Sequence, residues 1–226
     1  MTGQLEKREP FKPLIPKIRF AEFNNIRDVK RKISKRTAMV IVEPIQGERG
    51  VVPSERGFLK ALRDLTNEHG TLLCIDAVQT GMGRTGEWFG YESEGITPDV
   101  ITLAKGLGGG IPIGAMIAIG GAAKLFKPGQ HGSTFGGNPI AAASANATIS
   151  TIEEMNFLKE NSRKGESLKD KLRNISGVAD VRGEGLLLGI ILSEKRAKNL
   201  ATKLLNAGVL VNAPSDEVIR IAPAYV

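Results

Sequence analysis

The sequence predicts an α/β protein in which a mostly parallel sheet is covered by helices and followed by a smaller C-terminal α+β domain. Short apolar runs at 37–42, 72–76 and 99–104 alternate with segments of helical periodicity, which is typical of buried parallel strands. Toward the C-terminus, two pairs of short strand-like runs enclose a single helical segment, which indicates an α+β arrangement. We assign residues 1–152 to the first domain and residues 153–226 to the second.

The elements of the first domain follow from periodicity and turn residues. A helix is expected over 54–70 because its apolar residues recur on one face, with Ser54 as its N-terminal cap and Gly70 at its C-terminal end. The polar, glycine-rich segment 81–98 is expected to be a loop between two buried strands. A further strand is expected at 114–119.

The second domain is preceded by a long helical pattern. Residues 138–172 are expected to be helical, with one break near Gly165, because glycine is a poor residue for a helix interior. The expected elements after it are two strands within 178–192 around a glycine turn, a helix over 194–208 ended by Gly208, and short strands at 209–214 and 218–223.

Charge and composition exclude several classes of function. The chain has 226 residues, and its 31 basic and 24 acidic residues give a net charge of +7. Much of the excess lies in the first 36 residues with few aromatic side chains between the charges, so we expect a solvated basic face and no nucleic-acid site. The two histidines, His69 and His131, lack the spacing of metal ligands, so no metal site is expected.

The single cysteine and the uncharged run at 106–123 bear on the compartment. Cys74 lies inside an apolar run and has no partner in the sequence, so we expect a reducing, cytoplasmic environment. The uncharged run contains seven glycines and a proline, which suit a loop and a short strand better than a membrane-spanning helix. No membrane association is expected.

Two isolated charges follow neighbouring apolar strands, Asp76 after LLCI and Lys105 after VITLA. Ligands of parallel sheets bind at the carboxyl ends of the strands, so both side chains are expected in one crevice. Each alone is typical of a helix cap or of a solvated lysine. Together they suit pyridoxal phosphate, because a partly buried amine can form a Schiff base and a carboxylate can keep a pyridine nitrogen protonated. The motif HGSTFGGNP at 131–139 adds hydroxyl groups in a glycine-rich turn before a helix.

Five ordered motifs, VEPIQGERG, IDAVQTGMGRTG, TLAKGLGGGIPIGA, HGSTFGGNP and VIRIAP, resemble those of the class III aminotransferases, and the likeness covers essentially the whole chain. Within that family the motifs are most similar to the acetylornithine-type enzymes. The resemblance implies the fold type I architecture of pyridoxal-phosphate enzymes, with part of a large cofactor-binding domain, a small C-terminal domain and a homodimer. It also implies transfer of the terminal amino group of N-acetylornithine to 2-oxoglutarate, in arginine biosynthesis.

Matching these motifs residue by residue implies a set of cofactor-binding positions. Lys105 matches the lysine that forms the Schiff base, and Asp76 matches the partner of the pyridinium nitrogen. Val78 is similar to the residue packed on the ring, and Gln79 to the amide that binds the ring hydroxyl. Ala77 stands between them where the family usually carries glutamate, which removes a polar side chain from the site.

The same matching implies residues that bind the cofactor phosphate and the substrates. Thr134 matches the threonine that reaches the phosphate of the neighbouring subunit's cofactor, and Ser133 is similar to a substrate-contacting position beside it. Arg220 resembles the arginine that binds a substrate carboxylate. Glu48 resembles the glutamate that pairs with that arginine when the substrate presents an amine instead.

The resemblance also implies segments that this sequence does not contain: an upstream phosphate-binding turn, an aromatic residue stacked on the ring and a second substrate-binding arginine. We therefore expect Met1 to match an internal methionine, and the chain to match the C-terminal part of a longer enzyme and to stop before its last helix. Two alternatives stay open. The donor can be another ω-amino compound, such as ornithine, succinyldiaminopimelate or 4-aminobutyrate, or the chain can be a non-catalytic remnant of such an enzyme.

Overall fold

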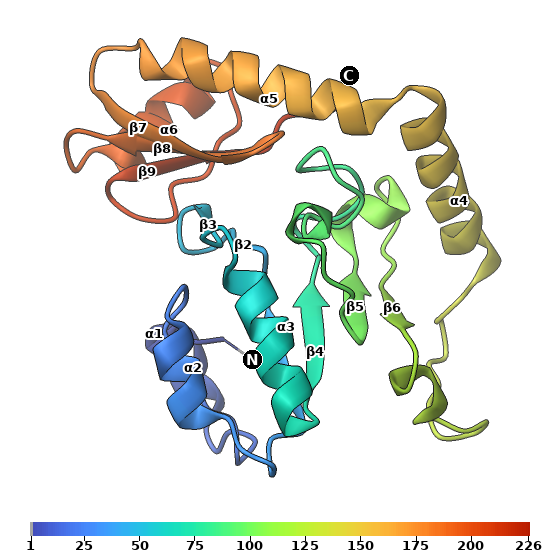
Figure 1. Ribbon diagram of the computed structural model, residues 1–226. Coiled ribbons are helices and arrows are strands. Elements are labelled where there is room, and N and C mark those ends of the chain that lie inside the picture. The colour runs from blue at the N-terminus through green and yellow to red at the C-terminus, as the bar shows by residue number, and fades with distance from the viewer. Residues whose placement is uncertain (1) are drawn as a thin grey trace.

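The structure is a computed structural model that describes residues 2–226 (Figure 1). One sheet has four strands in the order β1, β4, β5 and β6, with the bounds Met39–Val42, Leu72–Asp76, Val100–Leu103 and Ala115–Ala118. The strands β1, β4 and β5 are parallel, whereas β6 runs antiparallel to β5. The prediction of a mostly parallel sheet is therefore confirmed.

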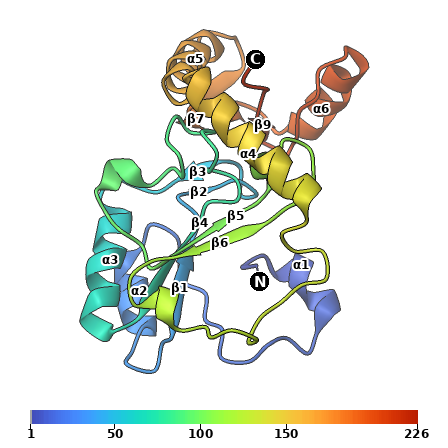
Figure 2. The same ribbon diagram turned by 90° about the vertical axis from the view of Figure 1, so that its right-hand side faces the viewer.

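Helix α3 (Phe58–His69) covers one face of this sheet (Figure 2), and α2 (Ile26–Lys32) packs against α3. On the opposite face, Met39, Ile41 and Met116 have side chains that are 40–52% exposed. The covered face is made by buried apolar side chains from α3, β4 and β5, namely Phe58, Leu59, Leu62 and Leu65, with Leu73, Ile75, Ile101 and Leu103.

The start of α3 differs from the sequence prediction, whereas its end agrees with it. Ser54 does not cap the helix, because its backbone N–H bonds the carbonyl oxygen of Pro44 at 2.8 Å, which extends the pairing of the preceding hairpin. The N-cap is Gly57, with φ of 83°, and a glycine has no side chain that could make a capping bond. At the other end Gly70 is left-handed, with φ of 63°, as expected of a glycine that follows a helix.

A second, antiparallel sheet has the order β7, β8 and β9, with the bounds Val178–Glu184, Leu187–Leu192 and Val218–Ile221. In Figure 1 it lies above the four-stranded sheet, with α5 along the top of the molecule. Helix α6 (Ala197–Asn206) packs on the same apolar cluster as α5. This cluster joins Val181, Leu188, Ile190 and Ile219 of the sheet to Leu168 and Leu172 of α5 and to Leu200 of α6.

The prediction of a short strand at 209–214 is wrong. Only Asn212 pairs there, in an isolated bridge to Arg220, with two backbone hydrogen bonds of 3.1 and 2.7 Å. Val209 and Leu210 are 47% and 83% exposed, so no burial against the sheet holds the rest of the segment in extended pairing.

The long helix breaks at Asn156, and the break predicted near Gly165 is wrong. Helix α4 (Pro139–Glu154) ends one residue before Met155, and Asn156 has φ of 52°, which turns the chain before α5 (Phe157–Arg173) begins. Gly165 is instead buried inside α5. A Cβ atom there would overlap the carbonyl oxygen of Gly185, in the turn between β7 and β8. Gly165 therefore allows close packing of α5 against the β7–β8 turn and does not interrupt the helix.

Two of the contacts that join the antiparallel sheet to the rest of the molecule lie at or next to the start of β8. The first is the hairpin of β2 (Ile45–Gln46) and β3 (Val52–Pro53), whose loop places Val51 against Leu187 with no exposed surface. In the second, the Arg84 guanidinium donates to the carbonyl oxygens of Leu186 and Pro223 at 3.1 and 2.6 Å. The remaining short elements are α1 (Leu5–Arg8), η1 (Glu9–Phe11), η2 (Glu92–Glu94), η3 (Lys105–Gly108) and η4 (Ala122–Lys124).

Among residues 2–226, every helix is too short or too polar to cross a lipid bilayer.

A buried carboxylate, Asp28, holds the first turn of α2 and makes stability depend on pH. It accepts hydrogen bonds from the Lys32 ammonium at 2.6 Å, the Glu22 backbone N–H at 2.8 Å and the Arg31 guanidinium at 3.0 Å. The Lys32 bond, the Glu22 N–H and the Arg31 bond hold the pKa of this carboxyl well below its usual value. A depressed pKa stabilises the folded state above the unfolded pKa of about 3.9, and this contribution is lost as the pH falls through the folded pKa.

We predict that Asp28→Asn lowers the free energy of unfolding at pH 7, and that its difference from the unsubstituted chain narrows as the pH falls below about 3.9. Urea titrations at pH 7 and pH 3 measure both effects. Asp64→Asn is the matched control, because the Lys60–Asp64 pair is exposed and spans 3.8 Å, so it should change stability by less than about 0.5 kcal/mol. Equal Asp28→Asn losses at the two pH values would contradict the prediction.

The close packing at Gly165 gives a second prediction. Gly165→Ala should destabilise the protein by roughly 1–3 kcal/mol, because the added methyl group forces α5 away from the β7–β8 turn. Gly121→Ala is the control: its φ is −64° and a Cβ there meets no atom within 4 Å. The midpoint of thermal unfolding should fall for the first variant only, and equal midpoints would show that α5 can shift without cost.

Candidate active site

The carboxyl ends of three parallel strands bring Glu43, Asp76 and Lys105 to one edge of the sheet. Val42 pairs with Ile75, and Asp76 pairs with Thr102, so the three strand ends lie side by side. Asp76 is the last residue of β4, and Glu43 directly follows β1. Asp76 and Lys105 therefore lie at the ends of adjacent strands, and a crevice shared by the two side chains stays a prediction.

Asp76 is fixed by two hydrogen bonds to one of its oxygens. Its Oδ1 accepts from the Val78 backbone N–H at 3.1 Å and from the Thr102 hydroxyl at 3.3 Å. Among the described residues no donor is found for Oδ2. Asp76 can therefore keep its orientation and still accept a hydrogen bond from a ligand.

Lys105 begins the 3₁₀ turn η3 in a strained backbone conformation. Its φ is 47°, and it follows Ala104, which is almost fully extended with φ of −164° and ψ of −148°. Positive φ is uncommon for a residue other than glycine, and such strain is concentrated at functional sites. Partial burial lowers the pKa of the Lys105 amine, while Glu43 and Asp76 act in the opposite direction. The arrangement suits an amine that gains and loses a proton.

A pocket of about 150 Å³ opens beside Lys105. The Gln79 side chain reaches this pocket and packs directly over Gly47, where a Cβ atom would overlap its amide. Gly47 is therefore needed for the position of this amide. The pocket is lined by Val78, Gln79, Gly81, Arg84, Lys105, Gly106, Leu187, Ala222 and Tyr225.

A charged pair lies close to this pocket. Glu48 Oε1 accepts a hydrogen bond from Arg220 Nη1 at 2.6 Å, and Glu48 Oε2 also binds Lys7 at 3.2 Å. The Arg220 bond, followed by the one to Lys7, lowers the pKa of the Glu48 carboxyl. The Arg220 side chain is 18% exposed, whereas that of Glu48 is 51% exposed, so the glutamate is the freer partner to move.

Ala77 lies in the hydrophobic core that α3 shares with β4 and β5. It is 1% exposed, and its backbone N–H bonds the Thr102 carbonyl oxygen at 3.0 Å. Its own carbonyl oxygen accepts from the Gly81 N–H at 2.7 Å, which closes the turn that carries Val78 and Gln79. Ala77 therefore acts here through its backbone and its small size.

Ser133 and Thr134 are not brought to this cluster within one chain. They lie in the exposed segment that follows β6 and η4. Leu103 pairs with Ala115 and Val100 pairs with Ala118, so the chain after β6 leaves the sheet at the end opposite Lys105. Their roles stay predictions.

The site contains residues that the sequence reasoning did not include. Glu43 carries the same signal as Asp76, a single carboxylate at the end of an apolar strand, but it is assigned no role from the sequence. Arg84 and Tyr225 form a wall of the pocket, with the guanidinium carbon 4.6 Å from the centre of the tyrosine ring. They are 141 residues apart in sequence, so only the fold reveals their contact.

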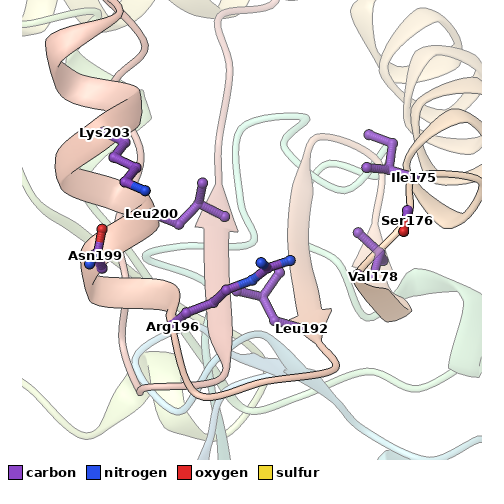
Figure 3. Close-up of a pocket in the computed structure, with 9 residues that line it drawn as sticks. Ile175, Ser176, Val178, Leu192, Arg196, Asn199, Leu200 and Lys203 are labelled. Carbon is purple, nitrogen blue, oxygen red and sulfur yellow. The ribbon is translucent and has the colours of Figure 1, made fainter.

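A second pocket, of about 340 Å³, contains none of the predicted site residues. Figure 3 shows Arg196, Asn199 and Lys203 on one side of it and Ile175 and Ser176 on the other. Among residues 2–226, there is no group of three or more His, Cys, Asp or Glu side chains placed to hold a metal ion.

Comparisons with known proteins agree with this geometry. The family model for class III aminotransferases matches residues 4–226. The acetylornithine aminotransferase of Corynebacterium efficiens is 49% identical over the whole of this chain, which spans 57% of that protein's length. The chain therefore covers little more than half of such relatives.

Solved structures share the fold. An N-acetylornithine aminotransferase from Stenotrophomonas maltophilia has a TM-score of 0.82 and 35% identity, with 92% of this chain and 56% of that chain covered. The ornithine aminotransferase of Toxoplasma gondii has a TM-score of 0.92 and 29% identity, with 99% and 55% covered. That enzyme was crystallised with partial occupancy of pyridoxal phosphate at its active site. With its family match and these relatives, the chain belongs to the class III aminotransferases.

Proposed function

We propose that this protein is a pyridoxal-phosphate-dependent aminotransferase that moves the terminal amino group of N-acetylornithine to 2-oxoglutarate. The observation that carries the proposal is the placement of Lys105, in strained backbone, and Asp76 at the ends of the adjacent strands β5 and β4. Family membership and the acetylornithine aminotransferases among the relatives support the choice of reaction and donor.

The residues at the strand ends fit the cofactor. The Oδ2 atom of Asp76 is available to a protonated ring nitrogen, the Gln79 amide to the ring hydroxyl, and Val78 to one ring face. The Lys105 amine would attach to the aldehyde. When bound, pyridoxal phosphate supplies an electron sink that stabilises negative charge at the substrate carbon.

Lys105 would then carry the proton of the reaction. Once the substrate amine has displaced it from the aldehyde carbon, the partly buried Lys105 amine would hold a proton less tightly than a solvated lysine does. It could then take a proton from the substrate carbon and deliver it to the former aldehyde carbon. Asp76 stabilises the proton at the ring nitrogen, and its two hydrogen bonds keep it in place during the transfer.

Arg220 and Glu48 would distinguish the two substrates. A guanidinium binds a carboxylate through two parallel hydrogen bonds, which suits a carboxylate of 2-oxoglutarate. With Glu48 paired to Arg220, as in the structure, the arginine charge is masked and the site accepts the terminal amine of the donor. Movement of the exposed glutamate would unmask the arginine for the keto acid.

The proposal includes a homodimer. Thr134 and Ser133 lie away from the Lys105 of their own chain, so in our proposal they serve a neighbouring subunit, Thr134 at the cofactor phosphate and Ser133 at the substrate. Residues 1–152 would form part of the cofactor-binding domain and residues 153–226 the smaller domain.

The direct test is chemical trapping. Incubation with pyridoxal phosphate followed by borohydride reduction should attach the pyridoxyl group to Lys105, because its amine is the one beside Asp76 with a lowered pKa. Peptide mass spectrometry locates the label, and Lys105→Arg should remove it. Lys124→Arg, in η4, is the control and should leave the labelling unchanged. A label on a different lysine would overturn the assignment of the site.

The carboxylate site gives a further prediction. Arg220→Lys should weaken 2-oxoglutarate binding by roughly 1–3 kcal/mol, because a point charge replaces a bidentate contact. Amino-transfer kinetics with varied keto acid measure the change. Arg163→Lys is the control, since Arg163 is exposed on α5 and pairs only with Glu160 among the described residues. Unchanged keto-acid kinetics in Arg220→Lys would show that another residue binds the substrate carboxylate.

A further inference from the structure

Glu43 and Asp76 lie on the same face of adjacent strand ends. The register Val42–Ile75 places Glu43 next to Asp76, and parallel strands are about 4.8 Å apart. Side chains alternate between the two faces of a strand, so Glu43 lies on the face of Ile41 and Asp76 on the face of Cys74. Ile41 is paired with Cys74 across the two strands. Both carboxylates therefore face the same way.

Glu43 is half-buried, and its neighbours hold it in position. Its Oε2 accepts a hydrogen bond from the Gly47 backbone N–H at 3.5 Å. The Gln79 amide packs directly against Gly47. The charged groups that face it are Asp76 from β4, Lys105 from η3 and Glu48 from the hairpin loop. Glu48 is itself engaged by Arg220 and Lys7.

The pKa values of Glu43 and Lys105 are both shifted by burial and by the charged groups around them. Burial and then Asp76 raise the pKa of the Glu43 carboxyl, while the Gly47 N–H and Lys105 oppose this rise. Burial lowers the pKa of Lys105, and among the charges that oppose this lowering Glu43 acts more strongly than Asp76. Arg220 is the cation that acts on Lys105 in the opposite sense to these carboxylates.

We propose that Glu43 is a positioning residue of this site, whose carboxylate is the main counter-charge of Lys105 and leaves Asp76 available for the cofactor. The inference rests on the proposed function for the role of Lys105. Once Asp76 pairs with a cationic ring nitrogen, its own charge is compensated there, and Glu43 remains to stabilise a protonated Lys105. The same compensation removes repulsion from Glu43, which then ionises more readily.

The first test measures Lys105 in the cofactor-free protein. Competitive acetylation of lysines by acetic anhydride across a pH series, followed by peptide mass spectrometry, gives the pH at which the Lys105 amine becomes reactive. In Glu43→Gln this midpoint should fall by about 0.5–1 pH unit, because the ammonium form loses a neighbouring negative charge. Glu43→Asp keeps the charge and should retain a midpoint close to that of the unsubstituted chain.

Glu184→Gln is the matched control. Glu184 in β7 is another carboxyl whose pKa is raised by burial, but its charged neighbours are Lys169, Glu166 and Glu94. Its substitution should leave the Lys105 midpoint unchanged. An unchanged midpoint in Glu43→Gln, or an equal fall in Glu184→Gln, would overturn the proposal.

The second test needs no substitution and decides the matter if Glu43→Gln fails to fold. Carbon-13 NMR titration of the side-chain carboxyls should give Glu43 a midpoint above the ordinary 4.5, and pyridoxal phosphate should lower it. A Glu43 carboxyl that is still protonated at neutral pH without cofactor would overturn the proposal, because a neutral carboxyl supplies no counter-charge to Lys105. Failure of the proposed function can be distinguished from failure of this inference. If only the proposed function fails, borohydride trapping misses Lys105, but the titration midpoint of Glu43 remains raised.

Discussion

Parallel pairing of β1, β4 and β5 ends three strands at one edge of the sheet, and each end delivers a charged side chain to the same place. The register Val42–Ile75 and Asp76–Thr102 fixes this, because a shift of one residue would turn Asp76 toward the core face covered by α3. The burial of Leu73 and Ile75 against α3 therefore also fixes the side of the sheet on which Asp76 lies.

The second sheet completes the site through packing contacts, not through continuity of the chain. The loop between β2 and β3 seats Val51 against Leu187, and the Gly50 carbonyl oxygen accepts from Arg182 Nε and Nη2 at 3.0 and 2.8 Å. The same loop carries Glu48 to Arg220 on β9. Arg220 is thus joined to the loop between β2 and β3 where this loop docks on the antiparallel sheet.

Strain and burial at Lys105 act together. Lys105 lines the pocket in a backbone conformation of positive φ, and partial loss of solvent weakens its hold on a proton. Left without counter-charges, such an amine would remain neutral over a wider pH range. Glu43 and Asp76 limit this effect, so the cluster balances a desolvated cation against two carboxylates instead of one.

The sequence by itself determined the parallel strands, the end of α3 at Gly70, and the positions of Asp76 and Lys105 at the ends of two strands, because apolar runs and the charges that end them are local signals. Tertiary structure decided the rest. Gly165 stays helical because α5 must approach the Gly185 backbone, and the chain turns at Asn156 instead. Ser54 continues the hairpin pairing and leaves the helix uncapped by its side chain. These outcomes depend on contacts between residues distant in sequence, and close packing and backbone pairing outweigh the local preference of a single glycine or serine.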